Sequence, residues 1–180
     1  MKKIIAWLLV CLMLVAVCGC SKDDNNVVSN DNSGVAATDA VKDEGPAAGT
    51  ELVTFYQAIL DAQPEGVEEL ILFEESNPDL IASFYPGLDA ITLNQQVFYM
   101  PPIATHPCEI VLVEAKNSDD AQAVAEIFEA RIVLGSDDTS YPESAAGWAQ
   151  FAQVQRSGNF VCMIVLPEAY VIPENVFAVN

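Results

Sequence analysis

The sequence has few positive charges and only one histidine. Seven lysines and arginines stand against 26 aspartates and glutamates, which gives a formal net charge of −19 at pH 7. Nucleic acids and anionic lipid headgroups are bound through cationic side chains, so this composition argues against both as partners. A structural zinc site needs several histidine or cysteine ligands, which this chain is poorly equipped to supply. We expect no nucleic-acid partner, no metal and no cofactor.

Cysteines are also few once the N-terminal segment is set aside. Five occur in the chain, and three of them, Cys11, Cys18 and Cys20, lie within or at the end of the first apolar run. The remaining two, Cys108 and Cys162, fall in expected strands. Outside the cytoplasm they can form a disulfide if the strands are neighbours with facing side chains. Otherwise they are buried free thiols that act as small hydrophobic groups, which is the alternative we favour.

The N-terminus has the pattern of a bacterial lipoprotein signal. Lys2 and Lys3 precede an apolar run over 4–17, which is shorter than the ~20 residues needed to span a bilayer. The run ends in Gly19-Cys20, and a small residue before a cysteine resembles the lipobox. We expect residues 1–19 to be a signal peptide cleaved between Gly19 and Cys20, and Cys20 to be lipidated. An uncleaved anchor and a plain secretory signal remain open alternatives.

The segment over 20–49 is polar and acidic, and it contains no aromatic residue. Such a segment cannot bury enough apolar surface to offset the entropy of ordering it, which predicts a disordered acidic tether. Residues 50–180 are long enough for one hydrophobic core and are expected to form a single domain. Loss of the leader with its two lysines would take the formal charge from −19 to −21.

Apolar periodicity predicts an α+β domain, a small antiparallel sheet packed against helices. The helices are expected over 51–62, 66–73, 118 to about 134, and 142–151, with a further turn or helix over 77–84. The strands are expected over 95–100, 108–115, 154–156 and 160–166, the last two forming a hairpin. The tail from Pro167 is expected to be a short helix or an extended edge.

Local signals place the helix ends. Thr50 and Ser118 are expected to be N-caps, and Gly135 is expected to stop the helix that begins at 118. Arg131 would then lie in the last turn of that helix, where a cation interacts favourably with the helix dipole.

The order of several motifs in the C-terminal half resembles a known family. The pieces are Glu109-Ile110-Val111-Leu112-Val113, then Asp120 and Arg131, then Tyr141-Pro142-Glu143, and finally Gly158-Asn159-Phe160-Val161 with a β run to Val165. This order resembles an uncharacterised family of clostridial-type lipoproteins, domain of unknown function number 4358 in its series. The likeness covers about 95–166 and the N-terminus, and Ala145-Ala146-Gly147 departs from the polar helix expected there. It implies a small α+β extracytoplasmic domain and a Gram-positive host, and no activity.

Few residues suggest chemistry. His106 would need an oriented partner and a nucleophile such as Thr105, Ser140 or Ser157 to act as a general base. Four carboxylate pairs occur, namely Glu68-Glu69, Glu74-Glu75, Asp119-Asp120 and Asp137-Asp138. Glycosidase chemistry would require two carboxyls across a cleft, which no spacing here indicates. A loop with Asp137, Asp138, Ser140 and Glu143 has oxygen ligands that suit calcium, without the spacing of an EF-hand.

Two further groups are candidates for structural or binding roles. Arg131 and Arg156 are rare cations in this acidic domain and are expected to pair with carboxylates. Five aromatic residues belong to the core or line a groove, namely Phe84, Tyr85, Phe98, Tyr99 and Trp148.

The sequence predicts no catalytic residue. We expect a lipoprotein held at the extracytoplasmic face of the cell membrane through the lipid on Cys20, with a domain that binds an unknown protein or small-molecule ligand. The alternatives are an extracytoplasmic hydrolase that uses carboxylate or histidine chemistry, and a calcium-dependent interaction module.

Overall fold

A computed structural model describes residues 45–102 and 106–178. The expected signal peptide, the cleavage site at Gly19 and Cys20, and most of the expected tether lie outside the described residues. No helix among the described residues combines the length and apolar character needed to cross a bilayer.

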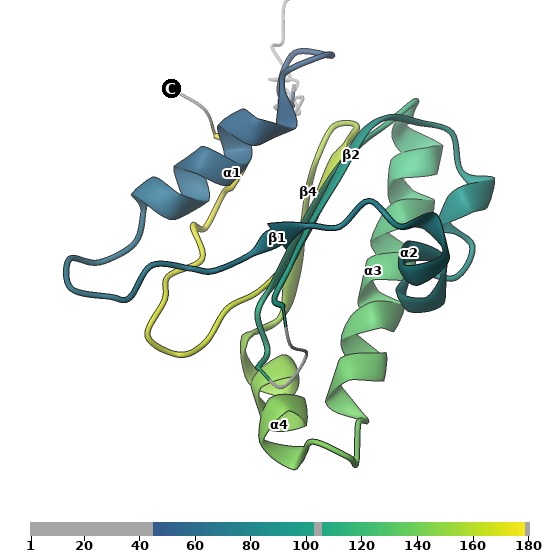
Figure 1. The fold of residues 1–180 in the computed structure, drawn as a ribbon. Helices are drawn as coiled ribbons and strands as arrows, with labels where there is room; N and C mark the ends of the chain where they lie inside the picture. The colour runs from purple at the N-terminus through teal and green to yellow at the C-terminus, as the bar shows by residue number, and fades with distance from the viewer. Residues whose placement is uncertain (1–44, 103–105, 179–180) are drawn as a thin grey trace, which may run out of the picture. The chain divides into compact units, whose positions relative to one another are not determined.

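A five-stranded antiparallel sheet forms the centre of the domain (Figure 1). Its strands, in spatial order, are β1 (Phe73–Glu74), β2 (Leu93–Met100), β3 (Glu109–Ala115), β5 (Phe160–Val165) and β4 (Gln153–Ser157). Of the three inner strands, β3 and β5 are buried along their whole length, which explains their nearly continuous apolar sequences. All four strands expected from the sequence are confirmed, and the strand over 73–74 is an addition.

Helices cover both faces of the sheet. Figure 1 shows α1 (Leu52–Asp61) on one face and α2 (Pro78–Phe84) and α3 (Ser118–Ser136) on the other. α4 (Pro142–Phe151) packs beside α3, and a short 3₁₀ helix, η1 (Leu88–Ala90), precedes β2. The α+β class predicted from the sequence is confirmed.

Alternation along β3 divides the hydrophobic core in two. Ile110 and Leu112 join the cluster under α1, whereas Val111 and Val113 join the cluster under α3. The same strand therefore has one glutamate on each face. Glu114 lies on the α1 side and accepts from the Gly49 amide and from Gln95. Glu109 lies on the α3 side and belongs to the site described below.

The helix expected over 66–73 is wrong. Leu70 and Leu72 pack against the α1-side core while Ile71 and Phe73 are exposed, which is the period of an extended chain. Phe73 and Glu74 then pair with Met100 and Tyr99 of β2. The pairing with β2 supplies backbone hydrogen bonds that override the weak helical pattern of this acidic segment.

Three expected helix ends are also wrong. Thr50 does not cap α1, because Glu51 occupies the N-cap and the Thr50 hydroxyl donates to the Ala47 carbonyl instead. Asn117, not Ser118, caps α3, since its side chain accepts from the amides of Asp119 and Asp120. Gly135 does not end α3, which continues to Ser136.

The tail follows neither expectation. Between Pro167 and Ala178 the described chain consists of turns and bends, with no helix and no strand. Val176 and Phe177 are nevertheless buried in the α1-side core, where Phe177 packs edge-on against Phe55 at 5.1 Å between ring centroids.

The chain also contacts the domain before residue 50. Gly49 donates its amide to buried Glu114, and Gly45 lies against the backbone of Ser157 and Gly158. Residues 45–49, the end of the expected tether, therefore lie along the fold.

Candidate functional site

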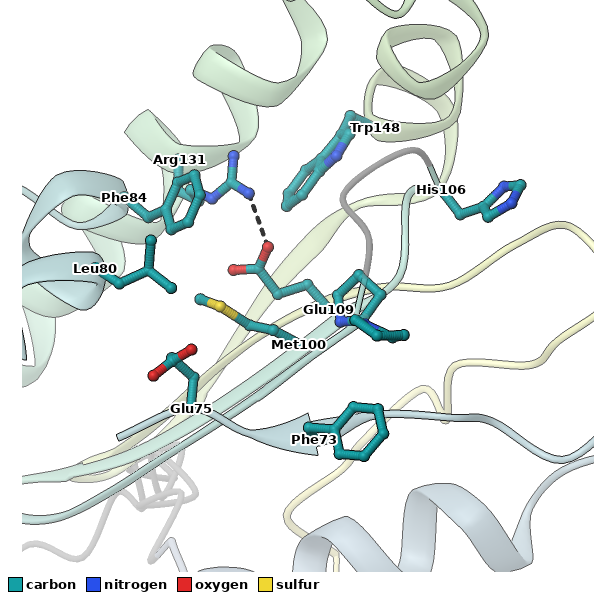
Figure 2. Close-up of a pocket in the computed structure, with 11 residues that line it drawn as sticks. Phe73, Glu75, Leu80, Phe84, Met100, His106, Glu109, Arg131 and Trp148 are labelled. Carbon is teal, nitrogen blue, oxygen red and sulfur yellow. Dashed lines mark hydrogen bonds and ion pairs between the residues drawn. The ribbon is translucent and has the colours of Figure 1, made fainter. Parts of the chain in front are cut away.

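A pocket of about 430 Å³ opens on the α3 side, where the ends of β2 and β3 meet the helices. Seven apolar residues line it: Phe73, Leu80, Phe84, Met100, Pro101, Pro102 and Trp148. Four polar or ionisable residues share the wall: Glu75, His106, Glu109 and Arg131. We call this cavity the Arg131 pocket (Figure 2). A mostly apolar cavity with a few converging polar groups is typical of sites for small organic ligands.

An ion pair crosses the inner wall of the pocket. Arg131 Nη2 of α3 donates to Glu109 Oε2 of β3 at 2.8 Å, and both side chains are buried. The other oxygen of Glu109 accepts from the hydroxyl of Tyr85, a fully buried residue. Each oxygen of Glu109 thus has a donor, as a carboxylate in a buried position requires.

Two aromatic rings enclose the guanidinium of Arg131. Its central carbon lies 4.2 Å from the ring centroid of Trp148 and 4.8 Å from that of Phe84. Figure 2 shows the guanidinium between these two side chains, which come from α4 and α2. Such cation–π contacts hold a guanidinium by its faces and leave its edges for hydrogen bonds.

The hydrogen-bonding capacity of Arg131 is mostly unused. A guanidinium has five N–H donors, and among the described residues only one acceptor, on Glu109, is met. The Nε atom is buried and has no described partner. An unsatisfied buried donor is costly and rare in folded proteins. The Nε donor is enclosed by the protein and out of reach of a ligand, so the group that the pocket wall can offer is Nη1, which meets no described acceptor.

Burial dominates the electrostatics of Glu109. Removal from water raises the pKa of its carboxyl, and the charge and hydrogen bond of Arg131 only partly lower it again. Buried ionisable groups with shifted pKa values cluster at functional sites. The oppositely charged Glu109 and Arg131 therefore make this pocket a candidate site.

The remaining ionisable residues stand at the rim. Glu75 follows β1 and is half-buried, and its Oε1 accepts from the amide of Asn77. His106 is exposed, and Figure 2 shows its ring pointing away from Glu109 and Arg131. In this view Leu80 and Met100 lie between Arg131 and Glu75.

The structure does not assemble the histidine site considered from the sequence. Thr105 lies outside the described residues, Ser140 lies in the loop before α4, and Ser157 is buried in β4. Among the described lining residues of the Arg131 pocket there is no serine, threonine or cysteine.

The carboxylate pairs are spread over the molecule. Of these pairs, only Glu75 reaches the Arg131 pocket. Asp119 and Asp120 are held at the start of α3 by Asn117, and Asp138 accepts from the Ser140 amide within its own loop. Within residues 45–102 and 106–178, no three histidine, cysteine, aspartate or glutamate side chains are grouped as metal ligands.

The two rare arginines behave differently. The expectation that Arg131 pairs with a carboxylate is confirmed, although the residue is buried in the body of α3 and does not lie in its last turn. Arg156 is exposed and donates to uncharged acceptors on Gln122, Ser118 and Gly158, which ties β4 to the start of α3.

The aromatic residues divide between core and pocket. Tyr85 and Phe98 belong to the α3-side core, Phe84 and Trp148 line the pocket, and Tyr99 stacks on Tyr56 at 3.7 Å between centroids.

Cys108 and Cys162 are both free and buried, as favoured from the sequence. Burial raises the pKa of Cys108 to about 11 and that of Cys162 to about 12. Both thiols therefore stay protonated and poorly nucleophilic at neutral pH.

Glu109 was not predicted as a site residue from the sequence. A usable signal was present, because a glutamate within an apolar inner strand must be buried and so requires a partner. The identity of that partner depends on the packing of α3, which the sequence does not reveal.

Comparison with known proteins gives one match. Residues 73–166 match a protein family, and every residue that lines the Arg131 pocket falls in this stretch. Searches of curated proteins and of solved structures found no match. The match does not bear on the lipoprotein and host parts of the resemblance, which stay predictions. Since it spans more than half of the sequence, the chain belongs to the family described as Domain of unknown function (DUF4358).

Proposed function

We propose that this protein is a lipoprotein, held at the extracytoplasmic face of a membrane through Cys20, whose domain binds a small organic ligand in the Arg131 pocket. The observation that carries the binding role is Arg131 itself. Its guanidinium is fixed between Phe84 and Trp148, and its Nη1 group meets no described acceptor on the wall of a cavity of about 430 Å³.

Rigidity supports binding over a purely structural role. A guanidinium fixed by aromatic rings and an ion pair loses little conformational entropy when a ligand accepts its hydrogen bonds. The cavity is within the usual size range of small-molecule sites, about 300–1,000 Å³. The described wall offers no hydroxyl or thiol nucleophile, both oxygens of Glu109 are engaged by Tyr85 and Arg131, and the ring of His106 points away from them, so we propose binding without catalysis.

The binding role is tested with a fluorescence and thermal-shift screen. Trp148 is the only tryptophan besides Trp7 of the expected leader, so emission from the mature protein reports on the pocket. Neutral, anionic, cationic and zwitterionic small molecules are screened at millimolar concentration. We expect members of at least one class to shift both the emission of Trp148 and the melting temperature.

A matched pair of surface variants provides the control. Phe73 and Val133 are both 58% exposed, and only Phe73 lines the pocket. We expect Phe73→Ser to weaken binding of any hit severalfold and Val133→Ser to leave it unchanged. If no class of compound alters the emission or the melting temperature, the binding role is wrong.

The membrane address has its own test. In the native host, mass spectrometry of the mature N-terminus should find acyl chains on Cys20, and Cys20→Ala should release the protein from the membrane fraction. Stable anchoring needs more than one acyl chain. We therefore also expect protein that has lost a single chain to be partly released from the membrane. An unmodified thiol at Cys20 in membrane-bound protein would contradict lipidation.

A further inference from the structure

The charges around the Arg131 pocket restrict what it can bind. The Nη1 group of Arg131 meets no described acceptor and calls for one, such as a carboxylate. The same wall carries Glu109 and Glu75, so the single positive charge is already matched by Glu109, and Glu75 adds a negative one. A simple anion would meet a wall without net positive charge, on a protein whose formal charge is −19.

A simple cation fits no better. An ammonium group could pair with Glu75, whose Oε2 accepts no hydrogen bond from the described residues. It would leave the free donors of Arg131 without an acceptor. The apolar part of the wall between Arg131 and Glu75 would also remain exposed to water. Leu80 and Met100 lie in that stretch (Figure 2).

From this arrangement we propose that the ligand is a small zwitterion with an apolar side chain, of the class of apolar amino acids and short peptides. This inference rests on the proposed binding function. The carboxylate of the ligand accepts from Arg131 and its ammonium group donates to Glu75. Its side chain packs against Leu80, Phe84 and Met100. The ligand is neutral overall, so the negative field of the protein does not oppose its approach.

The test compares three probes that differ in charge at one end. Dileucine carries both termini, N-acetyl-dileucine lacks the ammonium group, and dileucine amide lacks the carboxylate. Binding to the mature protein is measured by Trp148 fluorescence and calorimetry. We expect dileucine to bind at least about tenfold more tightly than either derivative, since each derivative loses one charge-assisted hydrogen bond.

Neighbouring glutamates give a matched pair of variants. Glu75→Gln keeps an oxygen that accepts from the Asn77 amide, whereas Glu74 lies outside the pocket. We expect Glu75→Gln to lower the affinity for dileucine about tenfold and to leave that for the anionic N-acetyl-dileucine equal or higher, because the variant removes a negative charge from the wall. Glu74→Gln should change neither. If Glu75→Gln proves misfolded by circular dichroism, the probe comparison on the unaltered protein decides alone.

The outcomes separate this inference from the function on which it rests. Equal affinities for the three probes, or tighter binding of either derivative, would overturn the zwitterion and leave a pocket that binds small molecules. The same holds if none of the three binds while the broader screen yields hits of another class. A screen without hits in any class removes the binding function and this inference together.

Discussion

Glu109 and Arg131 are the buried charges of the pocket wall. Taking both charges out of water costs several kcal/mol each, and their mutual attraction repays this cost only with good geometry and further hydrogen bonds. Glu109 has both, through Arg131 and Tyr85. Arg131 has only one described acceptor, so the pair is satisfied on one side only. A buried ion pair with one unsatisfied member is weak evidence for a stabilising role and better evidence for a binding site.

The protonation of Glu109 should be visible in the pH dependence of stability. Burial raises the pKa of this carboxyl above its ordinary value of 4.5, so the folded state keeps a proton that the unfolded state has lost. The resulting stabilisation is complete below pH 4.5 and is lost as the pH rises through the raised pKa. Relative to Glu109→Gln, the unaltered protein should lose unfolding free energy between pH 4.5 and that pKa.

Urea denaturation of both proteins at several values between pH 4 and pH 8 measures this difference directly. Other carboxylates titrate alike in the two proteins and cancel from the comparison. A difference that stays flat, or grows in favour of the unaltered protein with rising pH, would mean that Arg131 outweighs desolvation.

Packing between α3 and α4 explains why Gly135 fails as a stop signal. The glycine is buried inside α3, and a Cβ placed there would overlap the indole of Trp148. The position thus needs glycine for a close approach between helices and not for a left-handed turn. The sequence contains no local mark that distinguishes these two uses.

Gly135→Ala should therefore destabilise the protein, by about 1–3 kcal/mol, although alanine normally stabilises a helix interior. In a Trp148→Ala background the clash is absent, and the same substitution should become neutral or stabilising by up to about 1 kcal/mol. A double-mutant cycle by urea denaturation gives the coupling. Equal effects of Gly135→Ala in both backgrounds would show that the indole does not limit this position.

How well a strand or helix could be predicted depended on how clear the apolar pattern in its own sequence is. The apolar runs of β3 and β5 and the helical spacing in α1 are local signals, and each element formed where expected. The segment over 66–73 failed because Val67, Leu70 and Ile71 have helical spacing while Leu70 and Leu72 have the spacing of an extended chain. Only pairing of Phe73 with Met100 decides between the two.

The Arg131 pocket was beyond prediction because its parts are distant in the chain. Phe84, Glu109, Arg131 and Trp148 come from α2, β3, α3 and α4, and each is a common residue in its own element. Phe84 and Trp148 were candidates for a groove, and Arg131 was expected to meet a carboxylate. Their meeting in one wall follows from the order of the strands and the packing of three helices on one face, which arises only in the complete fold.

The excess of negative charge should make the stability of the whole domain depend on salt. Residues 50–180 hold 20 acidic residues and three basic ones, so exposed carboxylates repel one another more in the compact state than in the unfolded chain. The screening length falls from about 30 Å at 0.01 M to about 3 Å at 1 M ionic strength. Sodium chloride at 0.5 M should therefore raise the melting temperature by several degrees above its value at 0.02 M.

The buried Glu109–Arg131 pair contributes little to this change, because solvent ions do not screen it well. At pH 3.5, where most carboxylates are neutral, the increase should largely vanish in calorimetric scans. A salt effect of equal size at both pH values would point to a general effect on hydration instead of to relief of charge repulsion.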